Sequence, residues 1–413
     1  MKDSISTKRK AFEIFILFLI LLTALFYRRS DAFLNPQLWA EAGTQIFQGW
    51  ETLHFKSLLV VYAGSGYLIT VQRIVGAVIG LLHVNYSYIP FAYNLSAFLI
   101  TFFVAIALWH SALLLNIKHR ILYATMFVLL PVGNELFMDE ASLQWMTGIY
   151  LINYMFVWNN KVNEKYYFLT LVLLFIFSIS GPYGAVLSPV ILLIIFSNRK
   201  EATIKRLLPL FIILTGGIIQ VVCMKFIHPE AYGVRVASWD GFEKDHLHLL
   251  KLFTKNTSQL FCFENGMLPP MSARLKTILS LIILIVLFVF FVISYRKIKD
   301  KRKYILLLSA ILCFVSFIIT YWPKESKILA FESARYYFLP YTCIGWLLIM
   351  AWDEKIKIIY IAAYIYLLSF HYKYLRTFLP DKKWKEQIDE YYEGKRDTIE
   401  INPDGWKFAL PKK

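Results

Sequence analysis

Charged side chains gather where the first apolar segment of the chain ends. Arg29, Asp31 and Glu41 follow the apolar run 11–27. Such groups are costly beside the hydrocarbon of a bilayer unless they have a partner or a task. A carboxylate can accept the proton of an attacking hydroxyl, and a guanidinium can hold an anion through two parallel hydrogen bonds. This cluster is therefore the leading candidate for a functional site.

The elements that must position this cluster are membrane segments. Hydrophobic residues make up 58% of the 413 and charged residues only 17%, whereas a soluble chain has about 45–50% apolar and about 25% charged residues. The basic residues mostly stand at the ends of apolar runs, so the net charge of +16 indicates membrane orientation and not a nucleic-acid partner. The four cysteines have no spacing typical of a metal site or a disulfide framework.

About eleven apolar stretches could cross a bilayer, and we predict an all-α bundle. They are 11–27, 88–115, 121–138, 142–158, 166–180, 182–197, 207–227, 276–295, 304–322, 338–352 and 356–371. The pair within 166–197 is short and hinged at Gly181, and a re-entrant pair is equally compatible. Residues 58–83 are also apolar, but Arg73 is central in them. We expect one or two interfacial helices there.

The basic connections predict the orientation of the chain. They lie at 118–120, 199–206 and 296–303, and placing them in the cytoplasm also places the N-terminus there. The membrane domain is then 1–371. The loops 28–87, 228–275 and 323–337 and the polar C-terminal tail 372–413 share the outer, periplasmic face. Nucleotide-activated donors are cytoplasmic, so an enzyme acting on the outer face needs a donor carried by the membrane.

Six short motifs occur in the order found in a known family. They are 36–43 (Pro-Gln-Leu-Trp-Ala-Glu-Ala-Gly), Gly66-Tyr67-Leu68 with Arg73, Pro131 to Glu135 with Gln144-Trp145, Gly181-Pro182-Tyr183, Arg335-Tyr336-Tyr337, and 401–406 (Ile-Asn-Pro-Asp-Gly-Trp). Together they resemble the bacterial polytopic glycosyltransferases with the GT-C fold. The length and the polar tail resemble the serotype-converting O-antigen glucosyltransferases of enteric bacteria and their phages.

The resemblance implies a sugar transfer in the bacterial inner membrane. The donor would be a polyprenyl-phosphate sugar, specifically undecaprenyl-phosphate glucose, and the acceptor a repeat-unit sugar of the lipopolysaccharide O-antigen. A single in-line displacement would invert the anomeric configuration. We expect neither a metal nor a cofactor, and the partners are the donor lipid, the polysaccharide and the bilayer.

The family pattern has Asp where this chain has Ala42. That Asp would be a leading candidate for the general base. Glu41 is our first choice for the base in this chain and Asp31 the second, and an inactive copy is the remaining alternative. Asp31 could also be a helix N-cap.

Three arginines are candidates for binding the donor phosphate, on which negative charge builds as the leaving oxygen departs. They are Arg73, Arg335 and Arg29, and we expect a cavity in which Arg73 and Arg335 face each other between the first outer loop and 323–337. Arg28 and Arg29 could instead anchor the first helix at the headgroups.

A second polar cluster lies near the outer end of the 121–138 run. Glu135 and Asp139 could orient sugar hydroxyls, Gln144 could add a hydrogen bond and Trp145 a stacking face. Trp145 also fits the aromatic belt of a membrane protein.

Two other functions are compatible with the composition. A transporter or flippase for a lipid-linked sugar would favour an inverted repeat and charges near the bilayer midplane. The sequence has no evident repeat, and its charges lie at span ends. A non-catalytic assembly subunit is the other alternative, because Ala42 stands where the family pattern has Asp.

Overall fold

The computed structural model describes most of the chain. The described residues are 7–61, 66–130, 132, 134–159, 164–200, 203–227, 273–321, 335–352, 355, 358 and 379–410. Nearly all of the predicted crossing at 356–371, nearly all of the loop 228–275 and most of the loop 323–337 therefore lie outside the described residues.

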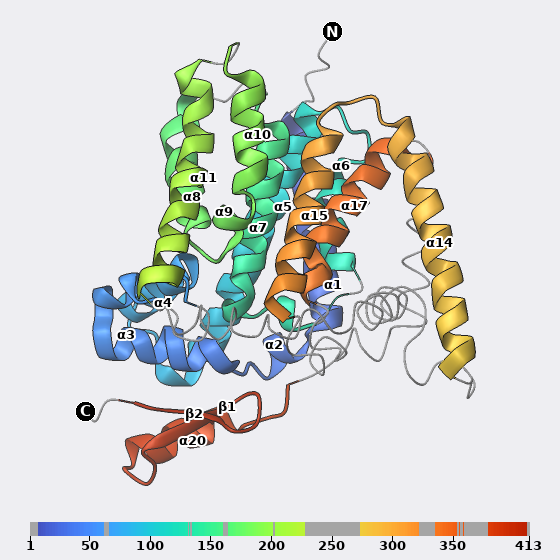
Figure 1. Cartoon of the computed structure of the whole chain (residues 1–413). Coiled ribbons are helices and arrows are strands. Elements are labelled where there is room, and N and C mark those ends of the chain that lie inside the picture. The colour runs from blue at the N-terminus through green and yellow to red at the C-terminus, as the bar shows by residue number, and fades with distance from the viewer. Residues whose placement is uncertain are drawn as a thin grey trace.

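The described chain is mostly helical, with two short strands (Figure 1). The main helices are α1 (Thr7–Arg28), α5 (Ile89–Leu114), α7 (Leu143–Val157), α8 (Tyr167–Ser178), α10 (Ser188–Asn198), α11 (Ile204–Val222), α14 (Ala273–Lys297), α15 (Lys303–Tyr321) and α17 (Phe338–Ala351). They run side by side as a bundle, and their buried faces form one apolar core that includes Leu21, Phe127 and Trp346. The predicted helical architecture is confirmed at this level.

Among the described residues, three helices are long and apolar enough to cross a membrane. They are Thr7–Arg28, Tyr86–Leu114 and Ile204–Ile227. Many of their large hydrophobic side chains are exposed, including Phe12, Leu99 and Ile218. A soluble protein would rarely expose so much apolar surface, so these helices indicate a membrane protein. The predicted number of eleven spans stays a prediction.

The length of the apolar run 121–138 suggested one continuous helix. The structure shows that the run does not form one. The helix α6 (Arg120–Thr125) continues into a single 3₁₀ turn, η4 (Met126–Leu129), and the backbone is extended at Leu130. Arg28 from α1 donates to the carbonyl oxygens of Val128, Leu130 and Val132. Because this guanidinium satisfies the carbonyls, the chain can leave the helix without stranding buried polar groups.

The stretch 166–197 folds as the short helices α8, α9 (Tyr183–Val186) and α10, and the chain turns back at a glycine. α8 and α10 contain 12 and 11 residues, or roughly 18 and 16 Å, which is less than the ~30 Å of a bilayer core. The turn contains Gly181 at φ +103°, a value that favours glycine. Its N–H donates to the Leu68 carbonyl at 2.9 Å. These lengths favour the re-entrant alternative.

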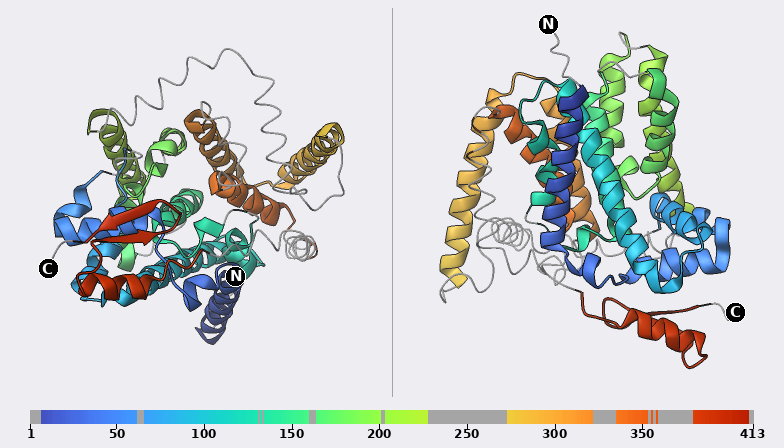
Figure 2. Two further views of the ribbon diagram at one scale, coloured as in Figure 1. Left: turned by 90° about the horizontal axis from the view of Figure 1, so that it is seen from below. Right: turned by 180° about the vertical axis from the view of Figure 1, so that it is seen from behind.

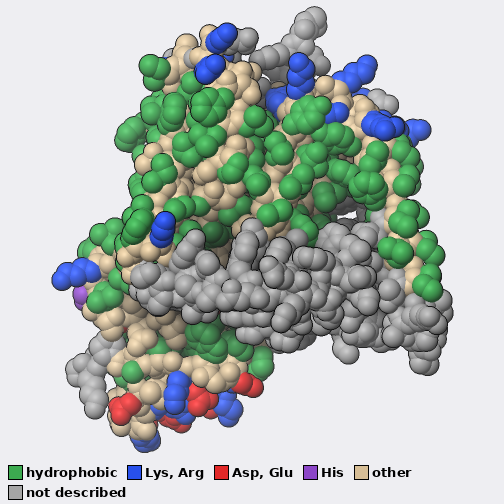
Figure 3. Space-filling view, in the orientation of Figure 1, with side chains coloured by type: hydrophobic (Ala, Val, Ile, Leu, Met, Phe, Trp, Pro, Cys, Tyr) green, Lys and Arg blue, Asp and Glu red, His purple; other side chains and the backbone are tan. Residues whose placement is uncertain are grey.

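The two ends of the bundle differ in character. Lys and Arg side chains gather at the end near the N-terminus (Figures 1 and 3). At the opposite end lie the short helices α2 (Asp31–Leu34), η1 (Ala42–Phe47, a π-helix), α3 (Gln48–Leu53), η2 (His54–Leu59) and α4 (Thr70–Leu81) (Figure 1). The helices within 58–83 are too short to span a bilayer.

The C-terminal tail packs beneath this second end of the bundle (Figures 1 and 2). It consists of α20 (Trp384–Tyr392) and a hairpin of β1 (Thr398–Ile401) and β2 (Trp406–Ala409), in which Ile401 pairs with Trp406. Apolar side chains of the tail, including Trp384 and Phe408, and of the short helices at this end of the bundle, including Phe47, form a second buried cluster. The tail is therefore joined to the 28–87 segment by a core of its own.

Candidate functional site

The segment 36–43 is held in place by the tail. The amide of Ala40 donates to the carbonyl of Asn402 at 2.5 Å, and the amide of Asn402 donates to the carbonyl of Leu38 at 3.2 Å. The side-chain amide of Gln37 donates to Asp381 Oδ1 at 3.2 Å, and its oxygen accepts from the Lys382 amide at 3.1 Å. Two motifs that lie far apart in the sequence therefore form one unit.

Glu41 and Ala42 lie side by side in this unit but in different surroundings. Glu41 is half-buried and precedes the π-helix η1. Ala42 is 2% exposed and belongs to the apolar cluster that also contains Ile401 and Phe408. A carboxylate at position 42 would therefore be buried among apolar side chains, whereas the carboxylate of Glu41 is partly accessible.

Asp31 is engaged in a buried ion pair. Arg29 Nε lies 3.1 Å from Asp31 Oδ1, and the side chains of the two residues are 4% and 8% exposed. Arg29 also donates to the carbonyl of Phe137 at 3.0 Å. The other oxygen of Asp31 accepts from the Leu379 amide at 3.2 Å. This pair joins the end of α1 to the 134–142 segment and to the start of the tail.

Asp139 is a buried carboxyl beside this group. It is 5% exposed, accepts from the Ala141 amide at 3.2 Å and lies 3.2 Å from the Ser142 hydroxyl. Burial raises the pKa of Asp139 to about 7, the positive charge of Arg29 opposes that rise, and the negative charge of Glu41 adds to it. The charge of Glu41 therefore acts on the titration of Asp139. A pKa near neutral suits a general base.

Glu140 is the third carboxyl of the acidic cluster that the sequence places at the end of the 121–138 run, with Glu135 and Asp139. It is 1% exposed, and neither of its carboxyl oxygens has a hydrogen-bond partner in the part of the chain that the structure describes. Burial, with the nearby Asp139 charge, raises the pKa of Glu140 well above its usual range. The position of Glu140 next to Asp139 was the signal available in the sequence.

Arg335 and Glu135 form an ion pair between two distant segments. Arg335 Nη1 lies 3.3 Å from Glu135 Oε2, with 34% and 18% of the side chains exposed. The Ser142 hydroxyl lies 2.7 Å from the Glu135 carbonyl oxygen and 3.2 Å from Asp139 Oδ2. Ser142 therefore connects this pair with the site of Asp139. Arg335 is the most accessible of the three candidate arginines, since Arg29 and Arg73 are 3% and 2% exposed.

Gln144 and Trp145 lie at the start of α7, facing the Gly181 turn. A side chain on Gly181 would meet Gln144, whose Oε1 is buried and has no partner among the described residues. Trp145 is 5% exposed, with its ring centroid 5.3 Å from Tyr336 and 5.6 Å from Tyr183. Because its faces are covered by protein, Trp145 packs in this structure and does not offer an open stacking face.

Arg73 stands apart from the other candidates. It lies in α4, and its Nη1 donates to the Gln45 carbonyl at 2.9 Å. Its Nε is buried without a hydrogen-bond partner in the described chain. The guanidinium therefore braces the π-helix η1. The expected cavity between Arg73 and Arg335 involves 323–334, which lie outside the described residues.

The chain matches no family model and no curated protein.

Proposed function

We propose that the protein is a GT-C-like glycosyltransferase of the bacterial inner membrane. It transfers a sugar, specifically glucose, from undecaprenyl phosphate to a repeat-unit sugar of lipopolysaccharide O-antigen on the periplasmic face, with inversion. The observation that supports this most is the buried carboxyl of Asp139, whose pKa is raised to about 7 by burial and further by the negative charge of Glu41.

The acceptor hydroxyl loses its proton as it attacks the anomeric carbon. Asp139 suits this step because its pKa of about 7 gives both a populated carboxylate and a useful basicity at neutral pH. Glu41 is more accessible than Asp139 and is the second carboxylate that could accept this proton. Asp31 fits the role less well than either, because Arg29 and the Leu379 amide occupy its oxygens.

The C–O bond between the sugar and the phosphate breaks as the new glycosidic bond forms, and the lipid phosphate leaves with the electron pair. Arg335 suits the binding of this phosphate because it is half-buried and its contact with Glu135, at 3.3 Å, is long. An incoming phosphate could exchange for the carboxylate. Arg29 and Arg73 are held by carbonyl oxygens, and we assign them to positioning.

The acceptor would lie against the segment 134–145. Glu135, Asp139 and the unpartnered oxygen of Gln144 supply acceptors for sugar hydroxyls. Trp145 holds Tyr336 and Tyr183 in place and would shape the site from behind.

A transfer assay tests the proposal. The purified protein in detergent is incubated with synthetic polyprenyl-phosphate glucose and an O-antigen oligosaccharide, and the product is detected by mass spectrometry. Glu41→Gln and Asp139→Asn should each abolish transfer, whereas Glu386→Gln, a change of an exposed tail carboxylate, should have no effect. A folded protein that never transfers sugar would favour the transporter or the assembly subunit.

A further inference from the structure

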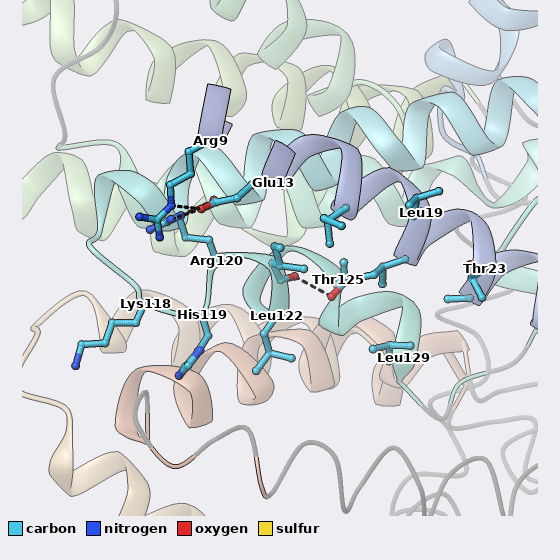
Figure 4. A pocket seen from close by; sticks show the side chains of 14 residues that line it. Arg9, Glu13, Leu19, Thr23, Lys118, His119, Arg120, Leu122, Thr125 and Leu129 are labelled. Atoms are coloured by element: carbon cyan, nitrogen blue, oxygen red, sulfur yellow. Dashed lines mark hydrogen bonds and ion pairs between the residues drawn. The ribbon is translucent and has the colours of Figure 1, made fainter. Parts of the chain in front are cut away.

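A cavity of about 720 Å³ lies beside α1 at the end of the bundle opposite the site described above. One wall comes from α1 and the other from residues 118–129 (Figure 4). Ligand pockets typically have volumes of about 300–1,000 Å³. The cavity is therefore large enough for a small molecule or for part of a lipid.

The two ends of this cavity differ in polarity. Arg9, Lys118 and Arg120 lie together at one end, and Leu19 and Leu129 line the other (Figure 4). Apolar side chains of α1 and α6 continue the wall between them. The basic end is the one nearer the N-terminus, where the lysines and arginines of the bundle gather (Figure 3). A matching ligand would be anionic at one end and apolar along the rest.

Glu13 fixes the basic end without neutralising it. It accepts from Arg120 Nε at 2.9 Å and Nη2 at 2.5 Å, from Trp109 Nε1 at 2.9 Å and from Arg9 Nε at 3.3 Å. Arg9 and Arg120 contact this one carboxylate, and Lys118 lines the same end of the cavity. The excess positive charge, held in a defined geometry, favours binding of an anion.

We propose that this cavity binds an anionic phospholipid. Its phosphate would lie between Arg9, Lys118 and Arg120, and an acyl chain would follow the apolar wall toward Leu129. Basic pockets between membrane helices on the cytoplasmic side bind anionic lipid headgroups in this way. A zwitterionic lipid carries its own cation, and a soluble anion would leave the apolar wall unused. Lipid binding here would stabilise the packing of α1 against α6.

The test measures the melting temperature of the full-length protein in detergent. Dioleoyl-phosphatidylglycerol at micromolar concentration should raise the Tm by on the order of 3 °C, and dioleoyl-phosphatidylcholine should raise it much less. Arg9→Ala with Lys118→Ala should remove the difference. Arg199→Ala with Lys200→Ala changes two exposed cations of the same basic end and should retain it.

Two further measurements distinguish binding of a phospholipid from binding of other ligands. Thr23→Trp fills the apolar end of the cavity and leaves the cations unchanged, so it should also abolish the phosphatidylglycerol effect. Inorganic phosphate at the same concentration should give no shift. Equal stabilisation by both lipids, a full effect from phosphate alone, or an unchanged effect in the Arg9/Lys118 variant would each overturn the proposal.

Discussion

The Nη1 atom of Arg335 lies 3.3 Å from Oε2 of Glu135, a residue 200 positions earlier in the chain. This contact joins the start of α17 to the 134–142 segment, which also holds Asp139. An arginine at such a junction can exchange its carboxylate partner for a phosphate, because both accept the same paired N–H donors. The pair is therefore a natural place to test how a donor lipid would be recognised.

Arg335→Lys should lower the kcat/KM for sugar transfer by about tenfold or more, because an ammonium loses the paired geometry of the guanidinium. Steady-state kinetics over a range of donor concentrations measure this change. Arg302→Lys is the matched control, since Arg302 is also paired with a carboxylate, Asp300 at 2.6 Å, but lies in a basic connection. Equal losses in both variants would remove Arg335 from donor binding.

Asp139 should give the protein a pH-dependent stability. Its folded-state pKa of about 7 lies above the ordinary value of 3.8. Between these values the folded state keeps a proton that the unfolded state has lost. Stability should therefore be highest below about pH 4, decline by roughly 4 kcal/mol up to pH 7, and stay level above it.

Asp139→Asn keeps an acceptor for the Ala141 amide and removes the titration. Thermal melts of both proteins between pH 5 and pH 8 should show a falling Tm in the parent and less decline in the variant. If Asp139 is also the base, the parent's transfer rate should rise with pH up to about 7, and the variant should be inactive. Normal transfer by the Asp139→Asn variant would show that Asp139 is not the base and only accepts the Ala141 amide.

Ala42→Asp should destabilise the protein and should not increase its activity. Ala42 is 2% exposed within an apolar cluster, and an unpaired carboxylate there should cost about 3 kcal/mol or more. Ala42→Ser, which adds only a small neutral group, should have a milder effect. Melting temperature and transfer rate are measured together. A stable, faster Ala42→Asp variant would support the reading of the parent as an inactive copy.

The helical class and the three long apolar helices were predictable from the sequence because long apolar runs indicate helices that can cross a membrane. Contacts between residues more than 100 positions apart in the sequence were not predictable in this way. Arg28, expected at the headgroups, is 3% exposed and donates to carbonyls of the 128–132 segment. Hydropathy also could not show that the 121–138 run ends its helix early, since the cause is this guanidinium on another helix.

Two buried polar residues within apolar runs escaped notice in the sequence. Glu13 in α1 holds Arg120, and Gln220 in α11 is 0% exposed and bonds to the backbone of Leu68 and Gly181. A lone carboxylate or amide inside an apolar run is a signal in itself, because it needs a partner there. The identity of the partner, however, depends on how the helices pack.

Gly43→Val should release the tail from the first outer loop. A Cβ at position 43 would lie 2.5 Å from Ile401 Cδ1 and 3.0 Å from Phe408 Cε1, so these side chains of the hairpin must shift to admit the valine. We expect faster proteolysis within 379–410 and loss of transfer, with the membrane domain still inserted. Lys395→Ala, which changes an exposed ion pair of the tail, should do neither.

Normal transfer by a protein lacking residues 380–413 would remove the tail from the mechanism.

Glu41→Gln and Asp31→Asn should separate chemistry from stability. Asp31 is paired with buried Arg29, so Asp31→Asn leaves that cation without its counterion and should cost about 3 kcal/mol of stability. Glu41 is half-buried, and Glu41→Gln should change the Tm little while lowering kcat by about 10²-fold or more. Melts and initial rates on the same preparations measure both. A variant Asp31→Asn with full stability and no transfer would reverse the assignment and make Asp31 the base.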